Sequence, residues 1–89
     1  MATPFHVTVL TPERTVFEGE AIHLLAPGTE GYLGVLAHHA PLLTGLKPGR
    51  LAVRTPDGRE QEFHVTGGFL EVSDNSARVL ADSVQAGPA

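Results

Sequence analysis

Hydrophobic and polar residues alternate with a period of two over most of the chain, which is the pattern of half-buried β-strands. In the first such segment Phe5, Val7 and Val9 share one face, and the polar residues between them face the other way. Residues 21–26 are more continuously apolar, which fits an inner strand covered on both faces. Further strands are predicted at residues 15–17, 32–36, 69–72 and 78–81.

Turn-forming residues separate these segments at intervals of about 8–12 residues, the spacing of all-β sandwiches and barrels. Asp57-Gly58 stands between two alternating segments, so a β-hairpin is predicted over residues 50–66. No long stretch keeps an apolar period of 3.6 residues, so no long helix is expected. The other turns are predicted at Thr11-Pro12-Glu13-Arg14, Pro27-Gly28-Thr29-Glu30-Gly31, Gly67-Gly68 and Asp74-Asn75.

Residues 37–48 interrupt the alternation. Pro41 could begin a helical turn, but Gly45 and Pro48 would end it within a few residues. We therefore expect an irregular connection whose leucines are buried, namely Leu42, Leu43 and Leu46.

Composition narrows the class of protein. A chain of 89 residues makes one domain, and its 42% hydrophobic and 18% charged residues exclude intrinsic disorder. The net charge of −4 argues against nucleic acid as a partner, and the lack of cysteine excludes disulfides and thiolate sites.

The N-terminus does not resemble a secretory signal, and the apolar stretches fall far short of the roughly 20 residues that span a bilayer. We expect a soluble domain whose contact with a membrane comes through a partner.

The five histidines are candidate metal ligands, but their spacing does not favour a metal site. No His-x-His or His-x-x-x-His spacing occurs, and the adjacent pair would point to opposite sides of an extended chain. Ordinary surface or loop positions are favoured, and a metal-dependent enzyme would need at least three of these side chains to converge. The five are His6, His23, His38, His39 and His64.

The sequence gives even less support to other kinds of catalytic site. Ser73, His64 and Asp82 supply the residue types of a hydrolytic triad, but no Gly-x-Ser-x-Gly elbow is present. Glu60 and Glu62 share a strand face with arginines nearby, which is typical of a solvated outer surface. The glycine clusters lack a phosphate-loop pattern and are interpreted as turns. An interaction domain, as a subunit or adaptor, fits best, and a stand-alone ligand-binding β-sandwich is the alternative.

Several sequence blocks resemble one known family, the N-terminal β-sandwich domain of the epsilon subunit of F-type ATP synthase. The similarity runs from Phe5 to Asp82. Its blocks are Pro27-Gly28-Thr29-Glu30-Gly31-Tyr32-Leu33-Gly34-Val35-Leu36, His39-Ala40-Pro41-Leu42-Leu43-Thr44, Leu46-Lys47-Pro48-Gly49, Gly67-Gly68-Phe69-Leu70-Glu71-Val72 and Val79-Leu80-Ala81-Asp82. The resemblance implies a flattened two-sheet β-sandwich of about ten short strands over residues 1–83, with residues 84–89 as a short C-terminal tail.

The resemblance also implies a function. Members of this family are non-catalytic, cofactor-free rotor subunits of the central stalk, which couple the gamma subunit to the ring of membrane c subunits while the alpha/beta head makes ATP. The expected location is peripheral, on the cytoplasmic face of the bacterial inner membrane, with proton or sodium as the coupling ion. Full-length relatives carry a C-terminal helical hairpin that can block rotation. The few residues after Asp82 cannot form it, so we expect coupling without that brake.

The resemblance also implies which residues of this chain lie at the gamma and c-ring interfaces. Tyr32 stands where the family often has an acidic residue, which favours an aromatic contact, and His38 stands where glycine is common. The expected c-ring interface is Glu30, Gly31, Tyr32 and Leu33. The expected gamma interface is Thr11, His39, Ala40, Pro41, Leu42, Leu43 and Thr44.

Overall fold

The computed structural model describes residues 2–86, and these form β-strands and no helix. No segment among them is therefore a candidate membrane-spanning helix. The strands are β1 (Phe5–Leu10), β2 (Thr15–Ala21), β3 (His23–Gly28), β4 (Gly31–Val35), β5 (Leu42–Leu46), β6 (Gly49–Arg54), β7 (Glu60–Val65), β8 (Gly68–Ser73), β9 (Ser76–Ala81) and β10 (Val84–Ala86).

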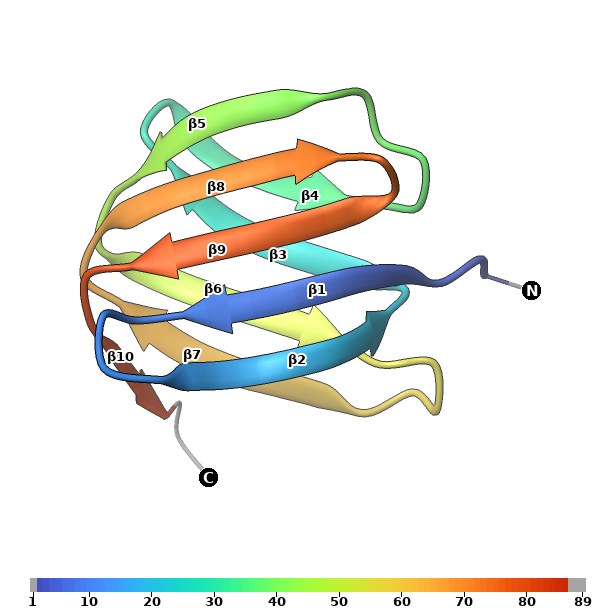
Figure 1. Cartoon of the computed structure of the whole chain (residues 1–89), viewed down its shortest axis with the longest axis horizontal. Coiled ribbons are helices and arrows are strands. Elements are labelled where there is room, and N and C mark those ends of the chain that lie inside the picture. The colour runs from blue at the N-terminus through green and yellow to red at the C-terminus, as the bar shows by residue number, and fades with distance from the viewer. Residues whose placement is uncertain (1, 87–89) are drawn as a thin grey trace.

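The ten strands of residues 2–86 form one sheet that folds over into two layers, as Figure 1 shows. The front layer has the order β5-β8-β9-β1-β2, and the back layer contains β10-β7-β6-β3 with β4 on the far side of β3. The layers are continuous where β3 meets β5 at the single pair Gly28 and Leu46. Principal extents of 32 × 29 × 23 Å agree with the predicted flattened all-β sandwich.

The core lies between the layers and follows from strand alternation. Phe5, Val7 and Val9 of β1 are buried, and β8 buries Leu70 and Val72 in the same way, whereas β6 buries three consecutive residues, 51–53. One contiguous cluster therefore joins both layers. Its largest fully buried side chains are Phe5, Leu24, Leu51 and Leu70.

Two of the predicted turns close hairpins, whereas the predicted turn Pro27–Gly31 is reduced to Thr29 and Glu30, because β3 extends to Gly28 and β4 begins at Gly31. The β6–β7 hairpin closes at Thr55–Gly58, where the Gly58 N–H donates to the Thr55 carbonyl at 2.9 Å and Gly58 has φ of 88°. In the β8–β9 hairpin, Asp74 and Asn75 both have positive φ, 50° and 58°, as a two-residue turn of the primed type requires.

Two expectations about residues 37–48 were wrong. Leu42–Leu46 is the strand β5, paired with β8 from Leu42–Val72 to Leu46–Gly68, so this part of the segment is not irregular. The strand alternates in burial: Leu46 is buried, Leu42 packs partly against the core, and Leu43 is 72% exposed. Its partner lies more than twenty positions away along the chain, so no local pattern revealed the pairing.

The C-terminal end of the described chain also belongs to the sheet. Val84–Ala86 forms β10, which pairs with β7 through Val84–Val65 and Gln85–His64. The structure thus adds to the sheet three residues that were assigned to the tail. The rest of that predicted tail, residues 87–89, lies outside the described residues.

A pair of leucine substitutions tests this division between core and surface. Leu70→Ala removes a fully buried side chain and should lower the free energy of unfolding by about 2–5 kcal/mol. Leu43→Ala, at a 72% exposed position, should change it by no more than about 0.5 kcal/mol. Urea unfolding followed by circular dichroism measures both. Similar losses in the two variants would contradict the assigned core.

Candidate interaction surface

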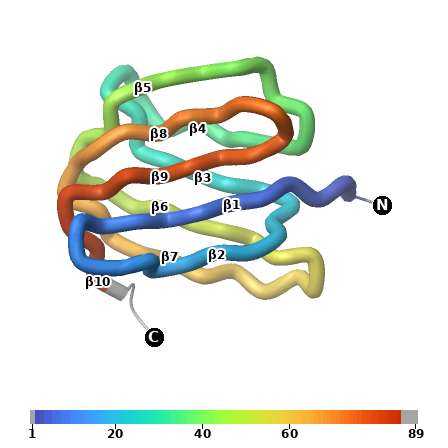
Figure 2. The backbone as a smooth tube through the Cα atoms, viewed as in Figure 1, coloured from blue at the N-terminus to red at the C-terminus, as the bar shows by residue number. Residues whose placement is uncertain are grey.

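The residues expected to contact gamma lie at two ends of the front layer. Thr11 is in the β1–β2 turn, His39, Ala40 and Pro41 are in the loop between β4 and β5, and residues 42–44 belong to β5. Figure 2 shows that the β1–β2 turn and the β4–β5 loop lie at opposite ends of the molecule. These positions therefore form no compact cluster, and the outer face of the front layer lies between them.

That outer face carries an apolar row formed by Leu10, Phe69 and Leu80. The strand register places Phe69 beside Leu80 and Leu80 beside Leu10, in three neighbouring strands. Phe69 is 57% exposed and Leu80 is 45% exposed, although both are large hydrophobic side chains. Neighbouring exposed apolar groups of this kind mark contact surfaces in soluble domains.

Two shallow hollows connect the apolar row to the expected gamma positions. The first is lined by Thr11 and Pro12 together with the apolar row. The second is lined by Pro41 and Leu43 with Glu71 and Ser73, which follow Phe69 along the outer side of β8. The outer face thus extends without interruption from the β1–β2 turn to the start of β5.

The residues expected to contact the c ring lie on the adjoining edge. Glu30 is exposed in the β3–β4 turn, and residues 31–33 begin β4. The Thr29 N–H donates to the Gly45 carbonyl at 3.1 Å, and the Lys47 N–H donates to the Pro27 carbonyl at 2.9 Å. Because these bonds hold the turn against β5, Glu30–Leu33 and Leu42–Thr44 line one hollow, and the two expected interfaces meet there.

Tyr32 has a structural contact as well as an exposed ring. Its hydroxyl oxygen accepts a hydrogen bond from the Arg50 N–H at 2.9 Å, while the residue remains 53% exposed. The close approach needs a glycine at position 49, since a Cβ there would lie 2.7 Å from the hydroxyl oxygen and 2.8 Å from the Pro27 Cβ. This hydrogen bond therefore holds the Tyr32 ring against the start of β6.

The β4–β5 loop contains a residue in an uncommon conformation. His38 has φ of 61°, a region that residues with a Cβ rarely adopt. Its N–H donates to the Asn75 side-chain oxygen Oδ1 at 2.8 Å. The next residue is also held locally, because the His39 N–H donates to the Leu36 carbonyl at 3.2 Å.

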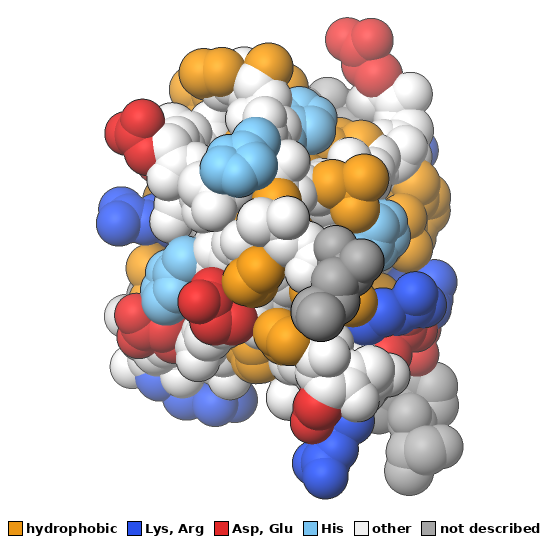
Figure 3. Space-filling view, turned by 90° about the vertical axis from the view of Figure 1, so that its right-hand side faces the viewer, with side chains coloured by type: hydrophobic (Ala, Val, Ile, Leu, Met, Phe, Trp, Pro, Cys, Tyr) orange, Lys and Arg blue, Asp and Glu red, His pale blue; other side chains and the backbone are white. Residues whose placement is uncertain are grey.

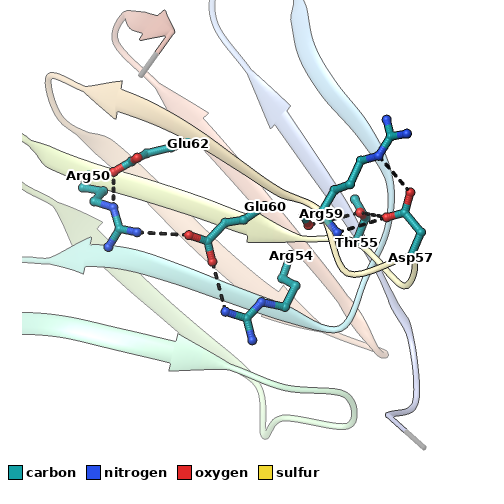
Figure 4. Close-up of polar contacts among 7 residues, drawn as sticks. All are labelled: Arg50, Arg54, Thr55, Asp57, Arg59, Glu60 and Glu62. Atoms are coloured by element: carbon teal, nitrogen blue, oxygen red, sulfur yellow. Dashed lines mark hydrogen bonds and ion pairs between the residues drawn. The ribbon is translucent and has the colours of Figure 1, made fainter. Parts of the chain in front are cut away.

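The paired carboxylates of β7 belong to a charged outer face on the back layer, shown in Figure 4. Arg50 pairs with Glu62 and, at 3.2 Å, with Glu60, and Arg54 also pairs with Glu60 at 3.2 Å. In the adjacent turn, hydrogen bonds from the Thr55 hydroxyl and the Arg59 N–H lower the pKa of Asp57. These ion pairs lie at the solvent-exposed surface, where each contributes little to stability, and they form the solvated outer face that the sequence indicated.

Neither candidate for a catalytic centre is assembled by the part of the chain that the structure describes. Within residues 2–86 no three His, Asp or Glu side chains come together as a metal site. Histidines lie apart from one another over the face in Figure 3, one of them beside acidic side chains, and His6 pairs with Glu18 at 3.2 Å. Ser73 lies at the turn end of β8, whereas Asp82 follows β9 at the other end of the same hairpin, so the triad is not formed.

The family is decided by a match along nearly the whole chain. Residues 4–87 match the family model described as ATP synthase, Delta/Epsilon chain, beta-sandwich domain. The chain belongs to this family. The resemblance first seen in the sequence blocks is therefore confirmed.

Curated relatives agree with this assignment. The chain is 43% identical over 82 residues to the ATP synthase epsilon chain of Dichelobacter nodosus, a match that covers 92% of this chain and 57% of the relative. It is 47% identical over 79 residues to the epsilon chain of Chromohalobacter salexigens, covering 89% of this chain and 56% of the relative. The chain thus spans less than two thirds of the length of these proteins.

Solved structures share the fold. A chain of the Euglena gracilis mitochondrial ATP synthase (OSCP/F1/c-ring, rotational state 1) superposes with a TM-score of 0.89 at 22% identity, over 97% of this chain and 55% of that one. A chain of the Tetrahymena thermophila mitochondrial ATP synthase central stalk and c ring gives a TM-score of 0.78 at 22% identity, over 96% of this chain and 68% of that one. At 22% sequence identity, these similarities show that the chains share the β-sandwich fold.

Sequence reasoning missed the apolar row, although a signal for it was present. Phe69 and Glu71 fall on one face of their strand, opposite Leu70 and Val72, and Leu80 falls on the side of Arg78. A large hydrophobic residue on the polar side of an alternating strand is the signal for a contact surface. Nothing local indicated that β9 lies beside β1.

Replacing Tyr32 with phenylalanine separates the role of its hydroxyl from that of its ring. Tyr32→Phe leaves the Arg50 N–H without this acceptor, so the free energy of unfolding should fall by about 0.5–1.5 kcal/mol. Chemical denaturation of the two proteins measures the difference. Unchanged stability would show that water replaces the phenol at the Arg50 N–H without loss.

Proposed function

We propose that this sandwich is the non-catalytic, central-stalk part of an F-type ATP synthase epsilon subunit, held between the gamma subunit and the c ring. In this role it turns with the rotor and carries no chemistry of its own. Its location is peripheral, at the cytoplasmic face of the bacterial inner membrane, and its contact with the alpha/beta head is indirect. Membership of the family supports the proposal, as do the names of the relatives.

The observation that carries the gamma contact is the apolar row on the outer face of the front layer. Phe69 and Leu80 are more than two fifths exposed, and burying both against a partner would remove a large apolar area from water. The two segments that the family resemblance assigns to gamma flank this row. Large hydrophobic side chains at the centre of a contact, with polar groups around them, are typical of binding hot spots.

The structure also suits a part that must transmit torque. The two proposed interfaces meet at β5, where the β3–β4 turn is hydrogen-bonded to that strand. Force applied at the c-ring edge would reach the gamma face through paired strands and a close-packed core rather than through a mobile linker. The front and back layers share that core.

The gamma contact can be tested by removing the apolar row. Phe69→Ser and Leu80→Ser should each weaken binding to the purified gamma subunit of the same ATP synthase by about tenfold or more. Titration calorimetry measures the affinities. Leu36→Ser is the matched control, because Leu36 is 59% exposed but lies beside Ala2, Thr3 and Ile22, away from the apolar row.

Two outcomes would count against this proposal. If the unaltered protein does not bind gamma, the assignment to the central stalk fails. If it binds but all three variants bind equally well, gamma uses another surface. Circular dichroism of each variant shows that the sandwich remains folded.

The c-ring edge is open to cysteine crosslinking, since the chain has no cysteine of its own. In membranes that contain the assembled synthase, Glu30→Cys should crosslink to the c subunit through a short thiol-reactive photoprobe. Asp57→Cys serves as the control, because both positions are exposed turn residues but the β6–β7 turn lies far from the β3–β4 turn (Figure 1). Crosslinks to the c subunit from Asp57→Cys alone would reverse the proposed orientation.

A further inference from the structure

Asn75 joins three segments that are far apart in the sequence. Its side-chain oxygen Oδ1 accepts a hydrogen bond from the His38 N–H at 2.8 Å, and its Nδ2 donates to the Pro4 carbonyl at 3.3 Å. Its own carbonyl accepts a hydrogen bond from the His6 N–H at 3.2 Å. One residue of the β8–β9 turn thus holds both the start of β1 and the β4–β5 loop.

The hydrogen bond from the His38 N–H to Asn75 stabilises His38 in an unfavourable backbone conformation. At φ of 61° this residue has a conformation that is unfavourable for a side chain with a Cβ, and glycine would occupy it at lower cost. The conformation persists only where surrounding contacts stabilise it. The amide oxygen of Asn75 supplies such a contact directly to the backbone of the strained residue.

The β8–β9 turn does not itself require this side chain. Its two central residues need only the left-handed backbone, which glycine also adopts. Asp74 occupies the same turn at φ of 50° and is exposed. The side-chain amide of Asn75 can therefore be removed by substitution without loss of the β8–β9 turn.

We propose that Asn75 is a positioning residue that holds the β4–β5 loop, through the His38 N–H, in the conformation that presents His39, Ala40 and Pro41 to gamma. The gamma part of this inference rests on the proposed function, whereas the holding of the loop does not. Without the bond, His38 would leave the left-handed region and the loop would sample several conformations. Binding would then have to restore the ordered loop, which lowers affinity.

Two measurements on one set of variants test this. Hydrogen exchange by NMR reports on the loop in the isolated protein: Asn75→Gly should speed exchange of the His38 amide by about tenfold. Titration calorimetry reports on the partner: the same variant should bind gamma about 5- to 10-fold more weakly. Asp74→Gly, in the same turn, should change neither quantity.

Two further variants distinguish positioning from direct contact. Asn75→Asp keeps an acceptor oxygen for the His38 N–H and should retain slow exchange and gamma affinity. Adding His38→Gly to Asn75→Gly removes the Cβ from the left-handed position and should restore affinity to within about threefold of the unaltered protein. A residue that touched gamma itself would not be rescued in this way.

Each outcome decides one part. Unchanged exchange of the His38 amide in Asn75→Gly overturns the holding of the loop. Altered exchange with unchanged gamma affinity, or failure of His38→Gly to rescue, overturns the link to binding. If the unaltered protein shows slow exchange but does not bind gamma at all, the proposed function fails while the contact between Asn75 and the loop stands.

Discussion

The arrangement of this molecule depends on the pairing of β5 with β8. That ladder places Leu43 beside Glu71 and Gly45 beside Phe69, so β5 completes the front layer next to the strands that carry the apolar row. The same strand meets β3 where the two layers join and holds the β3–β4 turn by hydrogen bonds. Both proposed interfaces exist as continuous surfaces because this one short strand joins them.

Within β5 the two-residue period separates side chains that pack in the core from side chains that are exposed. Leu42 and Leu46 face inward and contribute to the core, whereas Leu43 faces outward and is largely exposed. The apolar row shows the same division on β8 and β9, where buried and exposed hydrophobic residues alternate. The same strands thus combine a close-packed interior with an exposed apolar surface.

Local patterns predicted much of the fold. Alternation located most of the strands, Asp57-Gly58 located a hairpin and Asp74-Asn75 located a turn, because residues close in sequence decide turn conformation and strand face. They did not locate β10 or β5, and β5 contains Gly45 and has a non-local partner, so it gives no local strand signal. The sequence blocks sufficed for the family, since they are contiguous and span almost the whole chain.

By itself, the sequence determined the all-strand class, the positions of most turns, the family, and which residues the family resemblance assigns to each interface. Only the tertiary structure decided how strands distant along the chain lie side by side, and hence that Leu10, Phe69 and Leu80 form one row. It likewise decided that His38 meets Asn75, 37 positions away. The physical reason is that pairing between distant strands depends on closing long loops around a shared core, which no short window of residues encodes.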